Sequence, residues 1–256
     1  MMEFIDTHSH LYIQDFDKDR DAVITESLQA GINRILLPNI DLDSMQSMLD
    51  VCKAYPAVCF PMIGLHPCDV KADYKDVLEQ IFNQFDNYKF IAVGEVGIDL
   101  YWDTTFLEEQ KEALRIQIRF ALEHDLPIII HKRQSYYETM EVLDEFSGEK
   151  LKGIFHCYSG SVEHAHAVIE RGFLLGIGGT MTYKSSNLDK ILPDIPLEKI
   201  VLETDSPYLT PVPHRGTRNK SSYIPIIAQK LAEIKQTTIE EVAVQTTKNA
   251  TELFSL

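Results

Sequence analysis

Two histidines and an acidic residue stand at alternate positions near the start of the chain, in the run Asp6-Thr7-His8-Ser9-His10. Alternate residues of an extended strand point to the same face, so we expect Asp6, His8 and His10 to share one face. Imidazole and carboxylate groups are common ligands of divalent metals. A single His-x-His is weak support for a metal site, and further ligands have to be found elsewhere in the chain.

Residues of the same types end other apolar runs. Glu95 lies in Gly94-Glu95-Val96-Gly97, and His131, His156 and Asp205 end three other runs. Each alone has an ordinary structural interpretation: the two histidines as core residues, Asp205 as a salt-bridge partner and Glu95 as a cap. Taken together, the pattern predicts that these side chains meet at one site and bind metal: His8, His10, Glu95, His131, His156 and Asp205. Six ligands exceed the three of a typical catalytic zinc. They suit two divalent cations about 3.5–4 Å apart that share a carboxylate, with Mg, Mn and Zn all possible.

The elements that position these residues alternate between strand and helix. Eight aliphatic runs are the expected strands: Phe4–Leu11, Arg34–Ile40, Val58–Leu65, Phe90–Asp99, Pro127–Arg133, Gly153–Gly160, Phe173–Gly179 and Ile200–Pro207. Several are apolar throughout, as in a parallel sheet buried on both faces. The fold class we expect is α/β, a TIM (β/α)8 barrel forming a single domain over residues 1–256, with the polar residues at the C-terminal rim of the strands. A doubly wound open sheet is the alternative, but no Gly-rich dinucleotide motif follows the first strand.

The segments between the expected strands show helical periodicity and helix-start signals. One apolar stripe includes Leu107, Leu114, Ile118, Ala121 and Leu122, and another runs through Ile239, Val242, Ala243, Thr246, Ala250 and Leu253. Three capping boxes are expected, pairing Thr105 with Glu108, Ser135 with Glu138 and Thr238 with Glu241.

Composition limits the function classes. The chain has 256 residues, 45% hydrophobic and 25% charged, with a formal net charge of −15. No apolar run approaches the roughly 20 residues of a membrane helix, and the start lacks the features of a secretory signal. The four cysteines have no zinc-like or redox spacing, so we expect reduced thiols in a cytoplasmic protein. An acidic body disfavours broad coating of duplex DNA, but it allows a local electropositive site.

With these residues in view, the chain resembles the TatD family of metal-dependent hydrolases along nearly its whole length. The matching strings are Phe4-Ile5-Asp6-Thr7-His8-Ser9-His10, Ile63-Gly64-Leu65-His66-Pro67, Val93-Gly94-Glu95-Val96-Gly97-Ile98-Asp99, Ile129-Ile130-His131, Phe155-His156-Cys157-Tyr158-Ser159-Gly160, Leu202-Glu203-Thr204-Asp205-Ser206-Pro207 and His214-Arg215-Gly216. The resemblance implies that His8, His10 and Asp205 hold one metal, that His131 and His156 hold the second, and that Glu95 bridges them. It also implies a cytoplasmic deoxyribonuclease with 3'-5' exonuclease-like action.

The chain departs from the family at the rim. Arg218-Asn219 is followed by Lys220-Ser221 where the family has Glu-Pro, and Lys132-Arg133-Gln134 follows His131 where the family often has a small residue and then Arg-Asp. Both departures leave the inferred ligands intact and concern the residues that would contact substrate.

We therefore expect a metal-dependent hydrolase of phosphodiester bonds, with Asp205 and Glu95 catalytic and Asp205 accepting a proton from the attacking water. DNA, single-stranded or at an end, is the expected substrate, with no membrane and no obligate protein partner. The residues expected to bind it are His66, Arg133, Tyr158, Arg215 and Arg218, with Lys220 and Tyr183 as further candidates. Asp6 and Glu203 are expected to orient imidazoles. Two alternatives stay open: hydrolysis of a small ester, amide or lactone on the same barrel, and a non-catalytic metal-binding protein.

Overall fold

The computed structural model describes residues 2–256, so Met1, the first residue of the expected domain, lies outside the described residues. The strands are β1 (Phe4–Asp6), β2 (Ile32–Pro38), β3 (Cys59–Met62), β4 (Val93–Asp99), β5 (Ile128–Arg133), β6 (Gly153–Phe155), β7 (Phe173–Ile177) and β8 (Ile200–Leu202). The α-helices are α1 (Arg20–Gln29), α2 (Leu42–Ala54), α3 (Tyr74–Phe82), α4 (Leu107–Glu123), α5 (Tyr136–Asp144), α6 (Val162–Glu170), α7 (Leu188–Ile191), α8 (Ile224–Lys235) and α9 (Ile239–Phe254). Short 3-10 helices are η1 (Gln14–Phe16), η2 (Pro67–Asp69), η3 (Phe85–Asn87), η4 (Gly179–Thr182), η5 (Leu192–Asp194), η6 (Leu197–Lys199) and η7 (Ser221–Tyr223).

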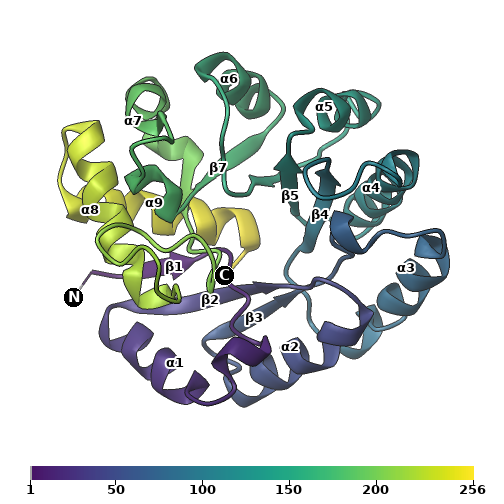
Figure 1. Ribbon diagram of the computed structural model, residues 1–256, viewed down its shortest axis with the longest axis horizontal. Helices are drawn as coiled ribbons and strands as arrows, with labels where there is room; N and C mark the ends of the chain where they lie inside the picture. The colour runs from purple at the N-terminus through teal and green to yellow at the C-terminus, as the bar shows by residue number, and fades with distance from the viewer. Residues whose placement is uncertain (1) are drawn as a thin grey trace.

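The strands form two parallel arcs that meet at both ends. One arc has the order β1-β2-β3 and the other the order β4-β5-β6-β7-β8. Between β3 and β4, the backbone N–H of Gly94 donates to the carbonyl of Ile63 at 2.8 Å. Between β8 and β1, the N–H of Thr7 donates to the carbonyl of Leu202 at 3.1 Å. The strands therefore close into a ring with helices outside it, as Figure 1 shows, and the predicted (β/α)8 barrel is confirmed.

A compact apolar layer fills the inside of the barrel. It takes side chains from strands around the ring and from the end of α9: Ile5, Leu36, Met62, Ile91, Ala92, Ile129, Ile154, Val201, Ala250 and Phe254, each at most 7% exposed. A larger cluster joins the outer faces of the strands to the helices. His131 lies two residues after Ile129, and His156 lies two residues after Ile154. Strand periodicity therefore turns both imidazoles into the barrel mouth above this layer.

Several strands are shorter than the sequence predicted. The runs Phe4–Leu11 and Ile200–Pro207 were expected to be strands throughout, whereas β1 ends at Asp6 and β8 ends at Leu202. The chain beyond these points leaves the regular ladder and forms the rim, so His8, His10 and Asp205 lie on post-strand segments. Strand propensity depends on tertiary context, so the sequence alone does not reveal where a ladder ends.

The two predicted amphipathic helices are present as α4 and α9, but only one of the three capping boxes forms. Thr238 and Glu241 cap α9 reciprocally. The prediction for Thr105 was wrong, because α4 begins at Leu107 after Phe106. The prediction for Ser135 was wrong as a side-chain cap: Ser135 precedes α5, but its hydroxyl donates to the carbonyl of Ile98 instead.

Within residues 2–256, no helix combines the length and the apolar character needed to cross a membrane.

Candidate active site

The Glu95 carboxylate stands at the centre of a cluster of imidazoles at the C-terminal rim of the barrel. Its Oε2 lies 3.0 Å from His8 Nε2 and 3.5 Å from His10 Nε2. Its Oε1 lies 2.6 Å from His131 Nδ1 and 3.7 Å from His156 Nε2. The two carboxylate oxygens thus face two different pairs of histidines, and four of the other five predicted ligands surround this one side chain.

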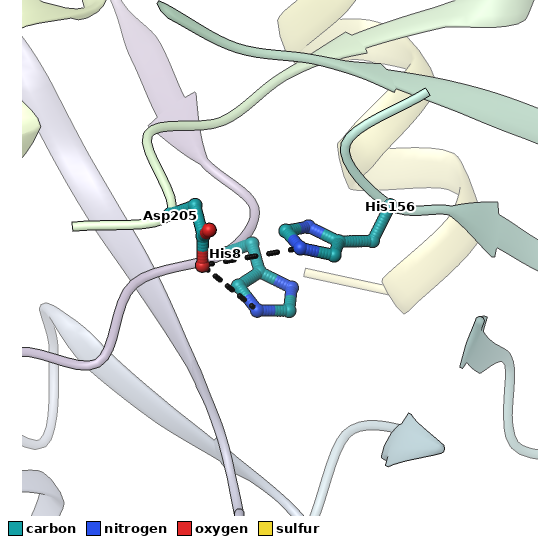
Figure 2. Close-up of side chains that lie close together, drawn as sticks. All are labelled: His8, His156 and Asp205. Atoms are coloured by element: carbon teal, nitrogen blue, oxygen red, sulfur yellow. Dashed lines mark ion pairs between the residues drawn. The ribbon is translucent and has the colours of Figure 1, made fainter. Parts of the chain in front are cut away.

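Asp205 supplies the sixth predicted ligand from the segment after β8. Its Oδ1 lies 3.8 Å from His8 Nε2, 3.5 Å from His10 Nε2 and 3.9 Å from His156 Nε2. Figure 2 shows Asp205 facing both His8 and His156. The Asp205 side chain is 16% exposed against 3% for Glu95. Asp205 is therefore the carboxylate of the pair that an incoming molecule reaches.

Burial and mutual contact shift the acid–base properties of the cluster. Burial raises the pKa of Glu95, but the imidazoles of His8, His66 and His156 outweigh that effect and hold its pKa well below its usual range. Burial and the neighbouring His156 lower the pKa of His8. Burial lowers the pKa of His10, but hydrogen bonds to Asp205 and Glu95 raise it to about 9. Glu95 is therefore an anion at neutral pH, as a shared ligand must be.

The arrangement fits divalent cations better than it fits a self-satisfied polar core. The rings of His8 and His156 stack with centroids 3.6 Å apart and planes 17° from parallel, so two protonated imidazoles would repel there. The buried Nδ1 atoms of His8 and His156 and the buried Oε2 of Glu203 have no hydrogen-bond partner. Unpaired buried polar atoms are costly. In groups of three, such as His8, His10 and Glu95, the nitrogen and oxygen donors all lie within 4.8 Å of one another and form a ligand set for Zn, Mn or similar ions.

The carboxylates of Glu203 and Asp99 lie beside the imidazole nitrogens of His156 and His131 that do not face Glu95. Glu203 Oε1 lies 3.0 Å from His156 Nδ1, out of line for a hydrogen bond, and the same carboxylate accepts from the N–H of Cys157 at 2.5 Å. Glu203 thus lies beside His156, and its role in orienting that imidazole stays a prediction. Asp99 Oδ2 lies 2.9 Å from His131 Nε2.

Asp99 and Tyr12 are residues that the sequence reasoning missed. Tyr12 Oη lies 3.2 Å from His10 Nδ1 and donates to the carbonyl of Pro38 at 2.6 Å. The alternation that marked His8 and His10 continues to Tyr12, and the alternation that begins at Glu95 continues to Asp99. Extending each alternating set by one or two steps would have found both residues.

The prediction that Asp6 orients an imidazole was wrong. Asp6 is fully buried and accepts hydrogen bonds from Thr204 Oγ1 and Ser221 Oγ, each at 2.6 Å. Ile5 packs in the inner apolar layer, so the neighbouring Asp6 faces the other way. Asp6 ties β1 to the segment after β8, and burial, partly offset by these hydrogen bonds, raises its pKa to about 7.

Of the residues expected to bind substrate, His66 lies at the histidine cluster and Tyr158 is buried away from substrate. His66 belongs to the cluster, with Nε2 3.5 Å from Glu95 Oε1, and its Nδ1 also accepts from the N–H of Cys68 at the start of η2. Tyr158 was predicted wrongly: it is 2% exposed, and its hydroxyl donates to the carbonyl of Ser161. A buried ring of this kind packs in the core and cannot stack on a base.

Arg218 was also predicted wrongly as a free phosphate clamp. Its guanidinium makes two hydrogen bonds to Asp19, at 2.9 and 2.6 Å. Lys220 is engaged in the same way, with Nζ 2.6 Å from Glu26 Oε1. The charges of Arg218 and Lys220 are therefore neutralised by acidic partners from other elements, which the sequence around them could not reveal.

Arg133 and Arg215 lie over aromatic rings. Arg133 Cζ is 3.8 Å from the ring centroid of Tyr101, and Arg215 Cζ is 4.4 Å from that of Tyr183. Within residues 2–256 neither guanidinium lies within 4 Å of a carboxylate, which leaves both charges available to an anion.

The chain is similar in sequence and in fold to known proteins. A family model described as TatD related DNase matches residues 5–255. The chain belongs to this family. Among TatD-family relatives, YabD of Bacillus subtilis, named an uncharacterized metal-dependent hydrolase, is 36% identical over 252 residues that cover 98% of each chain. The 3'-5' ssDNA/RNA exonuclease TatD of Escherichia fergusonii is 32% identical over 249 residues, covering 94% of this chain and 95% of that enzyme. The solved structure of YjjV, a TatD homologue from Escherichia coli K12, superposes with a TM-score of 0.92 at 28% identity, covering 99% of this chain and 98% of YjjV.

Membership in the TatD family confirms the predicted class of metal-dependent hydrolase on this barrel.

Proposed function

We propose that the protein binds two divalent cations around Glu95 and hydrolyses phosphodiester bonds of single-stranded DNA, in the manner of a 3'-5' exonuclease. The observation that carries the proposal is the division of the Glu95 carboxylate, whose Oε2 faces His8 and His10 while its Oε1 faces His131 and His156. One carboxylate between two sets of nitrogen donors is the arrangement that two bridged cations require.

The proposed ligands divide accordingly. His8, His10 and Asp205 would hold one cation, His131 and His156 would hold the other, and Glu95 would bridge them. When bound, such cations polarise a phosphoryl oxygen and lower the pKa of a coordinated water to near neutrality.

The side chains of this chain supply positioning and proton transfer. Asp205, the more exposed of the two central carboxylates, would accept the proton of the attacking water. Glu203 and Asp99 would keep His156 and His131 in place from behind. His66, beside Glu95 Oε1, would contact the substrate phosphate.

Nucleic acid as substrate is supported by the similarity to the Escherichia fergusonii 3'-5' ssDNA/RNA exonuclease and by the unpaired guanidiniums of Arg133 and Arg215. Arginine suits phosphate because its planar fork donates two parallel hydrogen bonds. The second candidate is a small ester, amide or lactone. It is favoured by the net charge of −15 and by the loss of Arg218 and Lys220 to acidic partners.

The test begins with metal analysis of protein purified without chelator. Hydrolysis of a single-stranded oligonucleotide, a chromogenic phosphodiester and an aryl ester is then measured with Mg²⁺, Mn²⁺ and Zn²⁺. We expect metal-dependent cleavage of the oligonucleotide from its 3' end. Cleavage of the aryl ester alone would favour the second candidate, and no hydrolysis of any substrate with metal restored would indicate a non-catalytic metal-binding protein.

Variants connect the activity to the cluster. Glu95→Ala and Asp205→Ala should each lower turnover by about 10³-fold or more, since each removes several kcal/mol of transition-state stabilisation. Glu108→Ala, whose side chain is 79% exposed on α4, is the matched control and should keep normal turnover. Near-normal turnover of either site variant in excess metal would refute the assignment.

A further inference from the structure

Two large aromatic side chains lie in solvent on the loop that follows β4. Tyr101 is 48% exposed and Trp102 is 69% exposed, and their rings meet edge to face with centroids 4.8 Å apart. Single exposed aromatic residues are common on protein surfaces. Two adjacent ones leave a larger apolar area in water, and an exposed apolar patch marks an interaction surface.

The guanidinium of Arg133, at the end of β5, completes the patch. Its Cζ lies 3.8 Å from the Tyr101 ring centroid and 5.2 Å from that of Trp102. Within residues 2–256 Arg133 makes no ion pair, so its charge is open to an anionic ligand. We call Tyr101, Trp102 and Arg133 the aromatic platform. It offers flat faces and one positive charge, the combination that nucleobases and phosphates share in single-strand binding sites.

The aromatic platform is fastened to the candidate active site through one carboxylate. Asp99 Oδ1 accepts hydrogen bonds from the N–H groups of Tyr101 at 2.8 Å and Trp102 at 3.3 Å, while its Oδ2 faces His131 Nε2 at 2.9 Å. Tyr101 follows Asp99 by two residues, and Arg133 follows His131 by two residues. On extended chain, two residues span about 7 Å. The platform is therefore a near neighbour of the cluster and has a fixed orientation to it.

We propose that the aromatic platform is a nucleobase subsite: one base of a single strand stacks on the exposed ring of Trp102, Tyr101 packs edge to face against that ring, and Arg133 contacts the adjoining phosphate. The proposal rests on the proposed phosphodiesterase function, because it places the strand whose bond the cluster would cleave. It assigns Tyr101 and Trp102 to binding, where the sequence reasoning included only Arg133. Stacking tolerates any base, so the subsite would select single strands rather than a sequence.

The chain provides its own reporter for the test. Trp102 is the only tryptophan in the sequence, so intrinsic tryptophan fluorescence reports on this ring alone. The unmodified protein, held in chelator to prevent cleavage, is titrated with a short oligo-dT and with an abasic oligonucleotide of the same length and charge. We expect oligo-dT to quench the fluorescence saturably and to bind about tenfold or more tighter than the abasic strand, since each stacked base contributes about 1–3 kcal/mol. Equal binding of the two strands, or no change in fluorescence, would overturn the proposal.

Variants separate stacking from structure. Binding of a labelled oligo-dT, measured by anisotropy, should weaken about tenfold or more in Trp102→Ala and recover in Trp102→Phe, which keeps a flat ring. Tyr88→Ala is the matched control: Tyr88 is 38% exposed but precedes β4, at the opposite end of the barrel, and its loss should not change binding. Binding equal to the unmodified protein in Trp102→Ala would contradict the subsite.

The two proposals fail in different ways. If oligo-dT quenches Trp102 but is not cleaved with Mg²⁺, Mn²⁺ or Zn²⁺, the nucleobase subsite stands and the phosphodiesterase function falls. If oligo-dT is cleaved with the same kcat and KM in Trp102→Ala and without quenching in the unmodified protein, the subsite falls and the phosphodiesterase stands. Saturable quenching by an aryl ester with none by oligo-dT overturns the subsite.

Discussion

Gly176, on β7, leaves room for the carboxylate of Glu203 beside His156. A Cβ added at Gly176 would lie 2.2 Å from Glu203 Oε2 and 2.7 Å from Glu203 Cδ. Ordinary contact needs about 3.4 Å between such atoms, so the carboxylate has to move by about 1 Å. Glu203 is 1% exposed and also accepts from the N–H of Cys157, so it has little room to move. The substitution Gly176→Ala should therefore displace Glu203 and leave the barrel otherwise intact.

The expected cost has two parts. Overpacking in a close-packed interior costs about 1–3 kcal/mol of unfolding free energy. Displacing Glu203 from its 3.0 Å contact with His156 Nδ1 should weaken metal binding by about 10–100-fold, the usual effect of losing a group that orients a ligand. Urea denaturation in chelator measures the first quantity, and calorimetric titration with Mn²⁺ or Zn²⁺ measures the second.

A double variant isolates the cause. In the Glu203→Ala background the obstructing carboxylate is absent, so Gly176→Ala should cost little further stability and no further metal affinity. The interaction free energy in the cycle should thus be about 1–3 kcal/mol, well above the 0.3–0.5 kcal/mol scatter of independent sites. Equal costs of Gly176→Ala in both backgrounds would refute the steric reasoning.

Removing metal with chelator should lower Tm by roughly 10 °C, relative to protein in metal at about a thousand times its Kd. Metal at that concentration adds about 4 kcal/mol per site to the free energy of unfolding. No shift of Tm in differential scanning calorimetry would contradict the metal assignment. Tyr158→Phe loses the hydroxyl that donates to Ser161, so unfolding should become easier by about 1 kcal/mol in urea while KM for an oligonucleotide stays unchanged; a raised KM would show that the hydroxyl contacts substrate. Arg218→Ala removes a partly exposed pair with Asp19, and we expect at most about 1 kcal/mol of lost stability with little change in KM, whereas a severalfold rise in KM would show that this arginine does contact substrate.

The site could be predicted from sequence where residue type and strand end coincide. His131 and His156 follow short apolar runs, and Glu95 lies within another, so the barrel pattern alone brings them to one rim. His8, His10 and Asp205 also reach the cluster, although β1 and β8 end before them. The rim segments keep these side chains near Glu95 through tertiary contacts, which strand periodicity does not describe.

The remaining predictions failed because they depended on contacts between residues far apart in the sequence. The positive charge of Arg218 is visible in the sequence, but its partner Asp19 is 199 residues away. Asp6 satisfied the alternating pattern, yet its neighbour Ile5 turned inward and left it against Ser221. Tyr158 was taken as a rim aromatic because it follows β6, and only packing shows that it is buried.

The central claim, that the Glu95 carboxylate bridges two cations, is tested most directly by a crystal structure of the protein grown with Mn²⁺ and measured at the manganese absorption edge. Two anomalous peaks are expected about 3.5–4 Å apart, one on the side of His8 and His10 and the other on the side of His131 and His156. A single peak, or peaks away from Glu95, would contradict the account.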